Sequence, residues 1–210
     1  MEKSKLNARV LTGVALLTAI VVVLQLLGSF VKFGVFSISL VLIPIVVGAA
    51  LYGIWAGAWL GFVFGLVVLL SGDAAPFLAV NPLGTIAVVL LKGAVAGFVS
   101  GLVYKALEKV DIQLLLTSKG KEVWGAELAV IVAAIVCPIV NTGIFLLGCW
   151  LFFIPEISIW AAASPYPDAW SYILFFMVGG NFLFELLFNL VLSPVIVRLI
   201  KIGRNRVQHS

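Results

Sequence analysis

Charged residues are scarce in this sequence. Only 10% of its 210 residues are Asp, Glu, Lys or Arg, whereas 63% are hydrophobic and the mean hydropathy is +1.25. Soluble domains carry about a quarter charged residues and about half apolar ones. A water-soluble fold of this length cannot hide so much apolar surface, because a globular protein keeps a polar exterior. The composition therefore predicts an integral membrane protein and argues against a soluble enzyme.

Histidine and cysteine are also scarce. His209 is the only histidine, and it lies in the C-terminal tail. Cys137 and Cys149 share one apolar segment, and on a helix they would be about 18 Å apart, too far for a disulfide. We therefore expect two buried cysteines that behave as small apolar residues. We expect no metal centre, no cofactor and no histidine-dependent catalysis.

Long apolar stretches predict an all-α membrane protein, a single domain (residues 1–210) built as a bundle of six transmembrane helices. Each span needs about 20 apolar residues. The second and third spans share one apolar stretch, which we divide at Gly53, so each is short. An apolar run this long after a basic N-terminal segment, without a small-residue cleavage site, favours a first helix over a signal peptide. The expected spans cover residues 10–30, 37–52, 54–71, 83–107, 127–153 and 170–200.

Basic residues indicate how the chain is oriented. Eleven of the thirteen lie in the N-terminal segment, around the 108–124 loop, or in the C-terminal tail. Basic loops face the cytoplasm, and six spans place these three groups on one side. We therefore predict a multi-pass protein of the cell membrane with both termini in the cytoplasm. Residues 31–36, 72–82 and 154–169 would then face outward as loops, either as lids over a pocket or as plain connectors.

Small residues recur at every fourth position on three of the expected helices. Such faces let helix backbones approach closely in lipid, where little hydrophobic force drives association. For the glycines we favour packing within the chain. For Ala15 and Ala19, docking against another membrane subunit is about as plausible. The two glycine series are Gly53, Gly57, Gly61 and Gly65, then Gly93, Gly97 and Gly101.

Three polar side chains in apolar segments point to a binding site. Lys92, Asn141 and Asn181 each lie about 13–17 Å below the outer boundary, at 1.5 Å per helical residue. Polar groups inside a membrane are costly and so often functional. An ammonium and two carboxamides at one depth suit a small polar anion. Asn81, in the outer 72–82 segment, is a further candidate contact.

A structural explanation of the same residues stays open. Glu185 is four residues beyond Asn181 on the same helix face, so it is either a ligand contact or the partner of Lys92. Asn189 continues that face and is able to hydrogen-bond between helices. Pro138 frees the carbonyl group of Ala134 from the helical pattern, which predicts a kink beside Asn141.

Taken together, these motifs resemble the substrate-binding S component of energy-coupling factor (ECF) vitamin transporters. The likeness covers nearly the whole chain and rests on the pattern more than on any one motif. Its elements are the basic N-terminal segment, Ala15-Leu-Leu-Thr-Ala19, Ile43-Pro44 before Gly48, Tyr52-Gly53 before Gly57, Lys92-Gly93 before Gly97 and Gly101, Val140-Asn141-Thr142, and Asn181 through Asn189.

The resemblance implies high-affinity binding of a vitamin or vitamin precursor near the outer side. It also implies docking through Ala15 and Ala19 on a transmembrane coupling subunit that carries two cytoplasmic ATPase subunits. The chain itself has no Gly-rich phosphate loop of the P-loop type, which fits that division of labour. Lys92 with few acidic partners favours a carboxylate-bearing ligand over a cation such as thiamine. Pantothenate is the first expectation, with folate and riboflavin next.

There are three alternatives to this function. A self-sufficient secondary carrier would be expected to show internal repeats, and none is evident. A membrane enzyme lacks support because the outer acids Asp73, Glu156 and Asp168 form no close motif. A structural or regulatory membrane subunit without a small ligand remains the last alternative.

Overall fold

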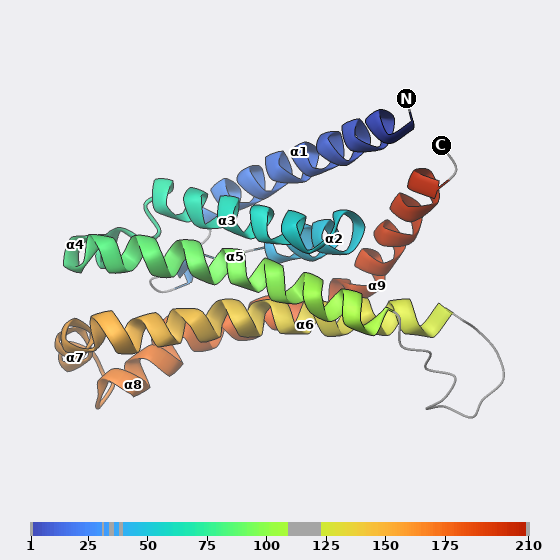
Figure 1. The fold of residues 1–210 in the computed structure, drawn as a ribbon. Helices are drawn as coiled ribbons and strands as arrows, with labels where there is room; N and C mark the ends of the chain where they lie inside the picture. Colours follow the sequence, from blue (N-terminus) through green and yellow to red (C-terminus); the bar gives the residue numbers. More distant parts are fainter. Residues whose placement is uncertain (1, 31, 34–35, 38–39, 109–122, 209–210) are drawn as a thin grey trace.

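The structure, a computed structural model, is almost entirely helical and describes residues 2–30, 32–33, 36–37, 40–108 and 123–208 (Figure 1). The π-helical segment η2 (Cys149–Phe153) follows α6, and another, η3 (Tyr172–Gly179), precedes α9. The short strands β1 (Lys32–Phe33) and β2 (Phe36–Ser37) pair antiparallel. The α-helices are α1 (Glu2–Ser29), α2 (Leu42–Tyr52), α3 (Ile54–Leu70), α4 (Ala75–Val80), α5 (Pro82–Leu107), α6 (Val123–Gly148), α7 (Ile154–Ala162), α8 (Ala169–Ser171) and α9 (Gly180–Gln208).

Four apolar helical stretches are long enough to cross a membrane, judged by length and composition. They are Ala8–Ser29, Pro82–Leu107, Leu128–Ala162 and Ala169–Ile200. The helices α2 and α3 are apolar but shorter, with 11 and 17 residues. Each of the six expected spans thus has a helix, and the expected shortness of the second and third is confirmed. That these two helices cross the membrane stays a prediction.

The predicted division at Gly53 is confirmed. Gly53 has φ +96°, a conformation that glycine adopts without steric cost. Its N–H donates to the carbonyl of Ala49 at the end of α2, and its own carbonyl accepts from Ala56 at the start of α3. One residue therefore closes the first helix and opens the second.

Two of the expected outer loops, 72–82 and 154–169, are wrong in part, because each of these two contains a short helix. The α4 helix lies within the 72–82 segment, and α7 occupies much of 154–169. Pro76 and Pro155 lie in the first turns of α4 and α7. Proline is well tolerated there because the N–H it lacks has no helical partner. The second span is also shorter than expected, since α2 begins only at Leu42.

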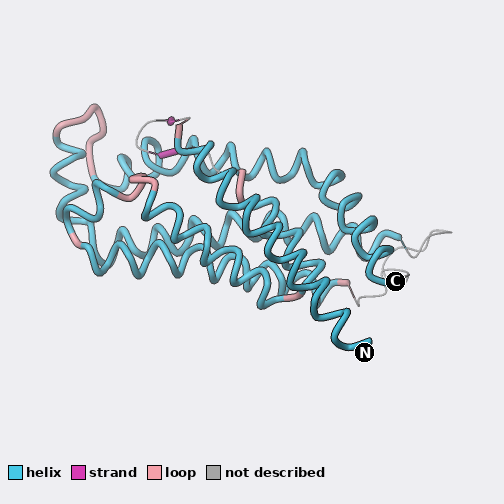
Figure 2. The backbone as a smooth tube through the Cα atoms, turned by 90° about the horizontal axis from the view of Figure 1, so that it is seen from above, coloured by secondary structure: helices cyan, strands magenta, loops and turns pink. Residues whose placement is uncertain are grey.

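Glycine contacts hold α3 against α5, which lie side by side (Figure 1). Figure 2 shows the same bundle from above, almost wholly helical. A Cβ on Gly57 would lie 2.6 Å from the carbonyl oxygen of Gly97, and one on Gly61 would overlap the carbonyl of Gly93. A Cβ on Gly65 would be 2.7 Å from the carbonyl oxygen of Val89. The interpretation of the glycine series as internal packing is confirmed for these positions, although Gly53 serves as a joint.

Two apolar clusters fill the interior. The larger joins buried residues of α2, α3, α5 and α6, including Cys137. The smaller lies where α4, η2, α7 and η3 meet, and it includes Cys149 and Phe77. Both cysteines are free and buried, as expected. Beside this cluster Asp168 caps α8, and hydrogen bonds from Ser171 hold the pKa of its exposed carboxyl below the usual value.

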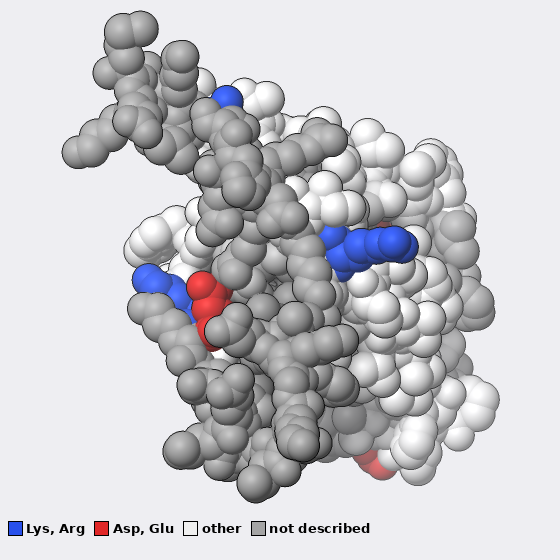
Figure 3. Space-filling model, turned by 90° about the vertical axis from the view of Figure 1, so that its right-hand side faces the viewer, with Lys and Arg blue, Asp and Glu red and all other residues white. Residues whose placement is uncertain are grey.

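One end of the bundle gathers the start of α1, the end of α5, the start of α6 and the end of α9 (Figure 1). Arg9, Lys105 and Arg198 belong to these helix ends and are exposed. Figure 3 looks onto this end and shows basic side chains on it. Lys109, Lys119, Lys121 and His209 lie outside the described residues. The arrangement agrees with one shared side for the three basic groups, while the cytoplasmic location of that side stays a prediction.

Candidate functional site

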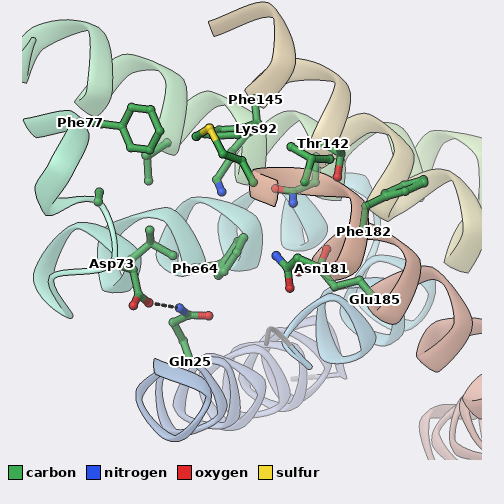
Figure 4. A pocket seen from close by; sticks show the side chains of 16 residues that line it. Gln25, Phe64, Asp73, Phe77, Lys92, Thr142, Phe145, Asn181, Phe182 and Glu185 are labelled. Carbon is green, nitrogen blue, oxygen red and sulfur yellow. Dashed lines mark hydrogen bonds between the residues drawn. The ribbon is translucent and has the colours of Figure 1, made fainter. Parts of the chain in front are cut away.

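A cavity lies inside the bundle, bounded by α1, α3, the segment leading into α4, α5, α6, η3 and α9 (Figure 4). The part of it that the centre of a water-sized sphere can reach is about 70 Å³. One water molecule needs about 10–15 Å³ of such space, so the cavity has room for several water molecules. Polar side chains from five parts of the chain line it: Gln25, Asp73, Lys92, Asn141, Thr142, Asn181 and Glu185.

Lys92 projects from α5 into this cavity (Figure 4). Its ammonium nitrogen is 5.6 Å from the ring centroid of Phe64 and 5.4 Å from that of Phe145. Cations within about 6 Å of an aromatic face are attracted by it. The charges of Glu185 and Asp73 also act on Lys92. The structure thus brings together the residues expected at one depth, since Asn141 and Asn181 line the same cavity.

The side-chain amides of Asn141 and Asn181 are unusual in their hydrogen bonding. Asn141 is only 5% exposed, and its Oδ1 atom is buried without a hydrogen-bond partner among the described residues. The Oδ1 atom of Asn181 is in the same state. A buried polar atom that makes no hydrogen bond costs about 1–3 kcal/mol. Both atoms therefore require a donor that the described part of the chain does not supply.

Glu185 and Asn189, one helical turn apart, have different surroundings. Glu185 lines the cavity and is 4% exposed. Among the described residues its carboxylate makes no ion pair with Lys92 within 4.0 Å. Asn189 instead donates from Nδ2 to the carbonyl of Ala134, at 3.2 Å. This is the carbonyl that Pro138 releases from the α6 pattern, so Asn189 satisfies the group that the proline leaves open.

A hydrogen bond at one side of the cavity was not expected from the sequence. Gln25 of α1 is 1% exposed and donates from Nε2 to Oδ2 of Asp73, at 3.0 Å (Figure 4). Ser71 also donates to this carboxylate, at 3.0 Å. The bond ties α1 to the segment between α3 and α4. A signal for it existed, because Gln25 is an amide inside the first apolar stretch.

Aromatic side chains make up much of the remaining wall. Phe77 lies edge-on to Phe145, Phe153 and Trp160, with ring centroids 5.0–5.7 Å apart. Phe64 and Phe182 line the cavity as well. These residues could not be found from the sequence, because one phenylalanine among fifteen in apolar segments carries no distinguishing signal.

Other candidates lie elsewhere. Asn81 is the N-cap of α5, and its Oδ1 accepts the N–H of Gly84 at 3.0 Å. It is not among the residues that line the cavity, so its expected contact with substrate has no support in this geometry. Ala15 and Ala19 are exposed on α1, so neither is used for packing within the described chain.

The charge balance of the cavity corrects one expectation. Lys92 was expected to have few acidic partners, but Asp73 and Glu185 line the same cavity. With all three groups charged, two negative charges face one positive charge. The argument from Lys92 for an anionic ligand therefore loses its premise.

Metal binding has no basis among the described residues, because no three His, Cys, Asp or Glu side chains there form a group that could hold an ion. The cavity instead offers hydrogen-bonding groups and aromatic faces. Such a lining suits an organic molecule, whose polar groups meet the few polar side chains while its apolar surface meets the phenylalanines.

Comparison with known proteins places the chain in a family. Residues 9–197 match the family model described as ECF transporter, substrate-specific component. A solved structure of ThiT from Listeria monocytogenes is similar, with a TM-score of 0.65 and 21% sequence identity, over 96% of this chain and 98% of that one. No significant match is found among curated proteins. The chain therefore belongs to the substrate-specific components of ECF transporters, a family of membrane transport components rather than of enzymes.

Proposed function

We propose that this chain, as a substrate-specific component of an ECF transporter, binds a small water-soluble vitamin or vitamin precursor in the cavity beside Lys92. The observation that carries the proposal is the pair of buried carboxamide oxygens, on Asn141 and Asn181, that no described residue satisfies. They lie in a cavity with aromatic walls, inside a chain whose family carries substrates. A small ligand with polar groups would satisfy these atoms and fill the space.

We further propose that all six apolar helices cross a bacterial plasma membrane, with both termini in the cytoplasm. The gathering of the exposed basic residues Arg9, Lys105 and Arg198 at one end supports this orientation, since basic residues are retained on the cytoplasmic side. Reporter fusions at either terminus test it, because a fluorescent protein that folds only in the cytoplasm would be bright at both ends.

The partners follow from the family. We propose that the chain docks through Ala15 and Ala19 on a transmembrane coupling subunit, and that two cytoplasmic ATPase subunits drive the transport cycle. The exposure of both alanines on α1 supports this, because small exposed residues allow close approach of another helix in the membrane.

Pantothenate is the vitamin expected first from the sequence, with folate and riboflavin next. None of the comparisons supports the preference for pantothenate, and the two carboxylates beside Lys92 weaken the reason for it. The test must therefore include uncharged, anionic and cationic vitamins side by side.

Thermal unfolding of the detergent-purified protein tests the proposal. Pantothenate, folate, riboflavin and thiamine are added singly, and a ligand present at a thousand times its dissociation constant stabilises the native state by about 4 kcal/mol. We expect one vitamin to raise the unfolding temperature. The shift should change in Lys92→Ala and persist in Arg198→Ala, since Arg198 is exposed near the far end of α9. The absence of a shift with every water-soluble vitamin tried would contradict the proposal.

A further inference from the structure

We infer that the cavity selects a ligand that presents a planar nitrogen heterocycle, with its N–H edge turned toward α6 and α9, rather than a ligand held by a carboxylate. The inference rests on the proposed function, and it assigns Asn141, Asn181 and Glu185 as the residues that determine specificity.

The buried amide oxygens determine which hydrogen-bonding groups a ligand must present. The buried oxygens of Asn141 and Asn181 are acceptors without a donor among the described residues. A carbonyl oxygen accepts hydrogen bonds only, so a ligand group facing these atoms must carry N–H or O–H. A carboxylate, which is itself an acceptor, would leave both oxygens unsatisfied and would face them with like polarity.

Glu185 adds a third acceptor. It follows Asn181 by one helical turn on α9 and lines the same cavity. Nothing among the described residues donates a hydrogen bond to it, and its carboxylate accepts several. The three groups therefore form an acceptor-rich wall. Asn189, one further turn along α9, is already satisfied by the carbonyl of Ala134 and does not belong to that wall.

Lys92 does not make up for this wall by holding an anionic ligand. Its ammonium is shared between the rings of Phe64 and Phe145, and the charges of Glu185 and Asp73 already act on it. A ligand carboxylate would add a third negative charge to a cavity that holds one positive charge. A neutral or weakly basic ligand adds none.

The aromatic lining indicates the shape of the ligand. Phe64, Phe77, Phe145 and Phe182 line the cavity, and flat rings stack on or against aromatic faces with a gain of about 0.5–1.5 kcal/mol per pair. A planar heterocycle meets these faces with its ring and the acceptor-rich wall with its N–H edge. An acyclic, flexible acid has no ring to place against these faces, and its carboxylate offers no donor to the wall.

Matched pairs of ligands test the inference through thermal unfolding of the purified full-length chain. The pairs are riboflavin with 3-methylriboflavin, which removes the ring N–H, and folate with its 2-desamino form, which removes the exocyclic amino group. Pantothenate serves as the acyclic acid. We expect a shift with a heterocyclic vitamin, the loss of most of that shift with its paired analogue, and no shift with pantothenate.

Substitutions give a readout that a purely structural role would not produce. In Asn141→Leu and Asn181→Leu the buried oxygen is replaced by an apolar group of similar size, which removes its desolvation cost. We expect the ligand-free protein to unfold a few degrees higher and the shift caused by the ligand to disappear. The matched control is Asn189→Leu, which breaks the bond to Ala134. It should lower the ligand-free midpoint and leave the ligand shift intact.

The outcomes separate the inference from the proposed function. A shift with pantothenate that survives Asn141→Leu and Asn181→Leu would overturn the inference and leave vitamin binding in place. Equal shifts with a vitamin and its paired analogue would also overturn it. No shift with any vitamin would remove the proposed function and the inference together.

Discussion

Lys92 shows how the meaning of one charged residue depends on its neighbours. In the sequence it is a lysine within an apolar stretch, which suggests an attractor for anions. In the fold it faces Glu185 and Asp73 across one cavity and lies against two phenylalanine rings. A buried charge is tolerated only when other groups compensate it. We therefore expect the lysine to have a structural task, the neutralisation of Glu185, whether or not a ligand touches it.

The first prediction concerns this charge pair. Lys92→Met should lower the unfolding temperature, because Glu185 would keep a buried charge without its main counter-charge. Adding Glu185→Gln should recover much of the loss, so that the two substitutions couple by about 1–3 kcal/mol. Thermal or denaturant unfolding of the four proteins of the cycle measures this coupling. Simply additive effects would show that Lys92 and Glu185 act independently.

Single residues could be predicted from the sequence where a polar group stood out against apolar neighbours. Lys92, Asn141 and Asn181 were found in that way, and they line one cavity. Gln25 carried the same signal, but its contact with Asp73, 48 residues away in the sequence, depends on the fold. Phe64 and Phe145 could not be found, since their role depends on three-dimensional proximity. The role of Asn81 as a helix cap was missed although Pro82 follows it, a common pattern at a helix start.

At the level of helices, α3 and α5 approach each other closely because glycines, which have no side chain, lie at their contact. Gly61→Ala would place a Cβ against the carbonyl of Gly93. The backbone cannot yield as a side-chain tip can, so the helices must separate, at a cost of about 1–3 kcal/mol. We expect a lower unfolding temperature for Gly61→Ala.

Gly143→Ala is the matched control for that substitution. Gly143 lies in α6, and a Cβ there would meet nothing within 4 Å. Alanine stabilises a helix relative to glycine by about 0.5–1 kcal/mol, so this variant should unfold at the same temperature or slightly higher. Equal losses in both variants would mean that the close approach of α3 and α5 does not limit stability.

Pro138 and Asn189 are linked through the carbonyl group of Ala134. In Pro138→Ala, residue 138 regains an N–H that can donate to the carbonyl of Ala134, the group that Asn189 satisfies. Asn189→Leu should therefore cost less in the Pro138→Ala background than in the native chain. A double-mutant cycle by thermal unfolding measures the difference, which we expect to exceed about 0.5 kcal/mol. An unchanged cost would show that the carbonyl has no need of Asn189.

Helices could be predicted from the sequence where a long apolar stretch was interrupted by a residue that ends helices. Gly53 marked the joint between α2 and α3 because only glycine readily takes its φ of +96°. The helices α4 and α7 were missed, since proline reads as a loop former while in fact favouring a first helical turn. The strands β1 and β2 are two residues each, too short to give a periodic pattern.

At the scale of the whole molecule, α1 has two different sides. Gln25 reaches inward to Asp73 at the cavity, whereas Ala15 and Ala19 are exposed. We predict that Ala15→Phe, which adds bulk to the proposed docking face, abolishes co-purification with the coupling subunit and ATPases. The vitamin-dependent rise in unfolding temperature should be unchanged, because the residue is far along α1 from Gln25.

Val191→Phe provides the control for that experiment. Val191 is 71% exposed on α9, and enlarging it should affect neither assembly nor ligand binding. If Ala15→Phe assembled normally, the docking face would lie elsewhere on the chain. Vitamin uptake in cells without any coupling module would be a stronger contradiction, because it would indicate a self-sufficient carrier.

The most direct measurement is a calorimetric titration of the purified chain with the vitamin that most raises its unfolding temperature. We expect one ligand per chain, and no binding heat in Thr142→Trp, which fills the cavity from its wall, provided that this variant still unfolds cooperatively. Gly143→Ala, the adjacent position with open space around it, should bind like the native chain. Undiminished binding by Thr142→Trp would place the ligand outside this cavity, and the absence of binding heat with every vitamin would contradict a vitamin-binding function.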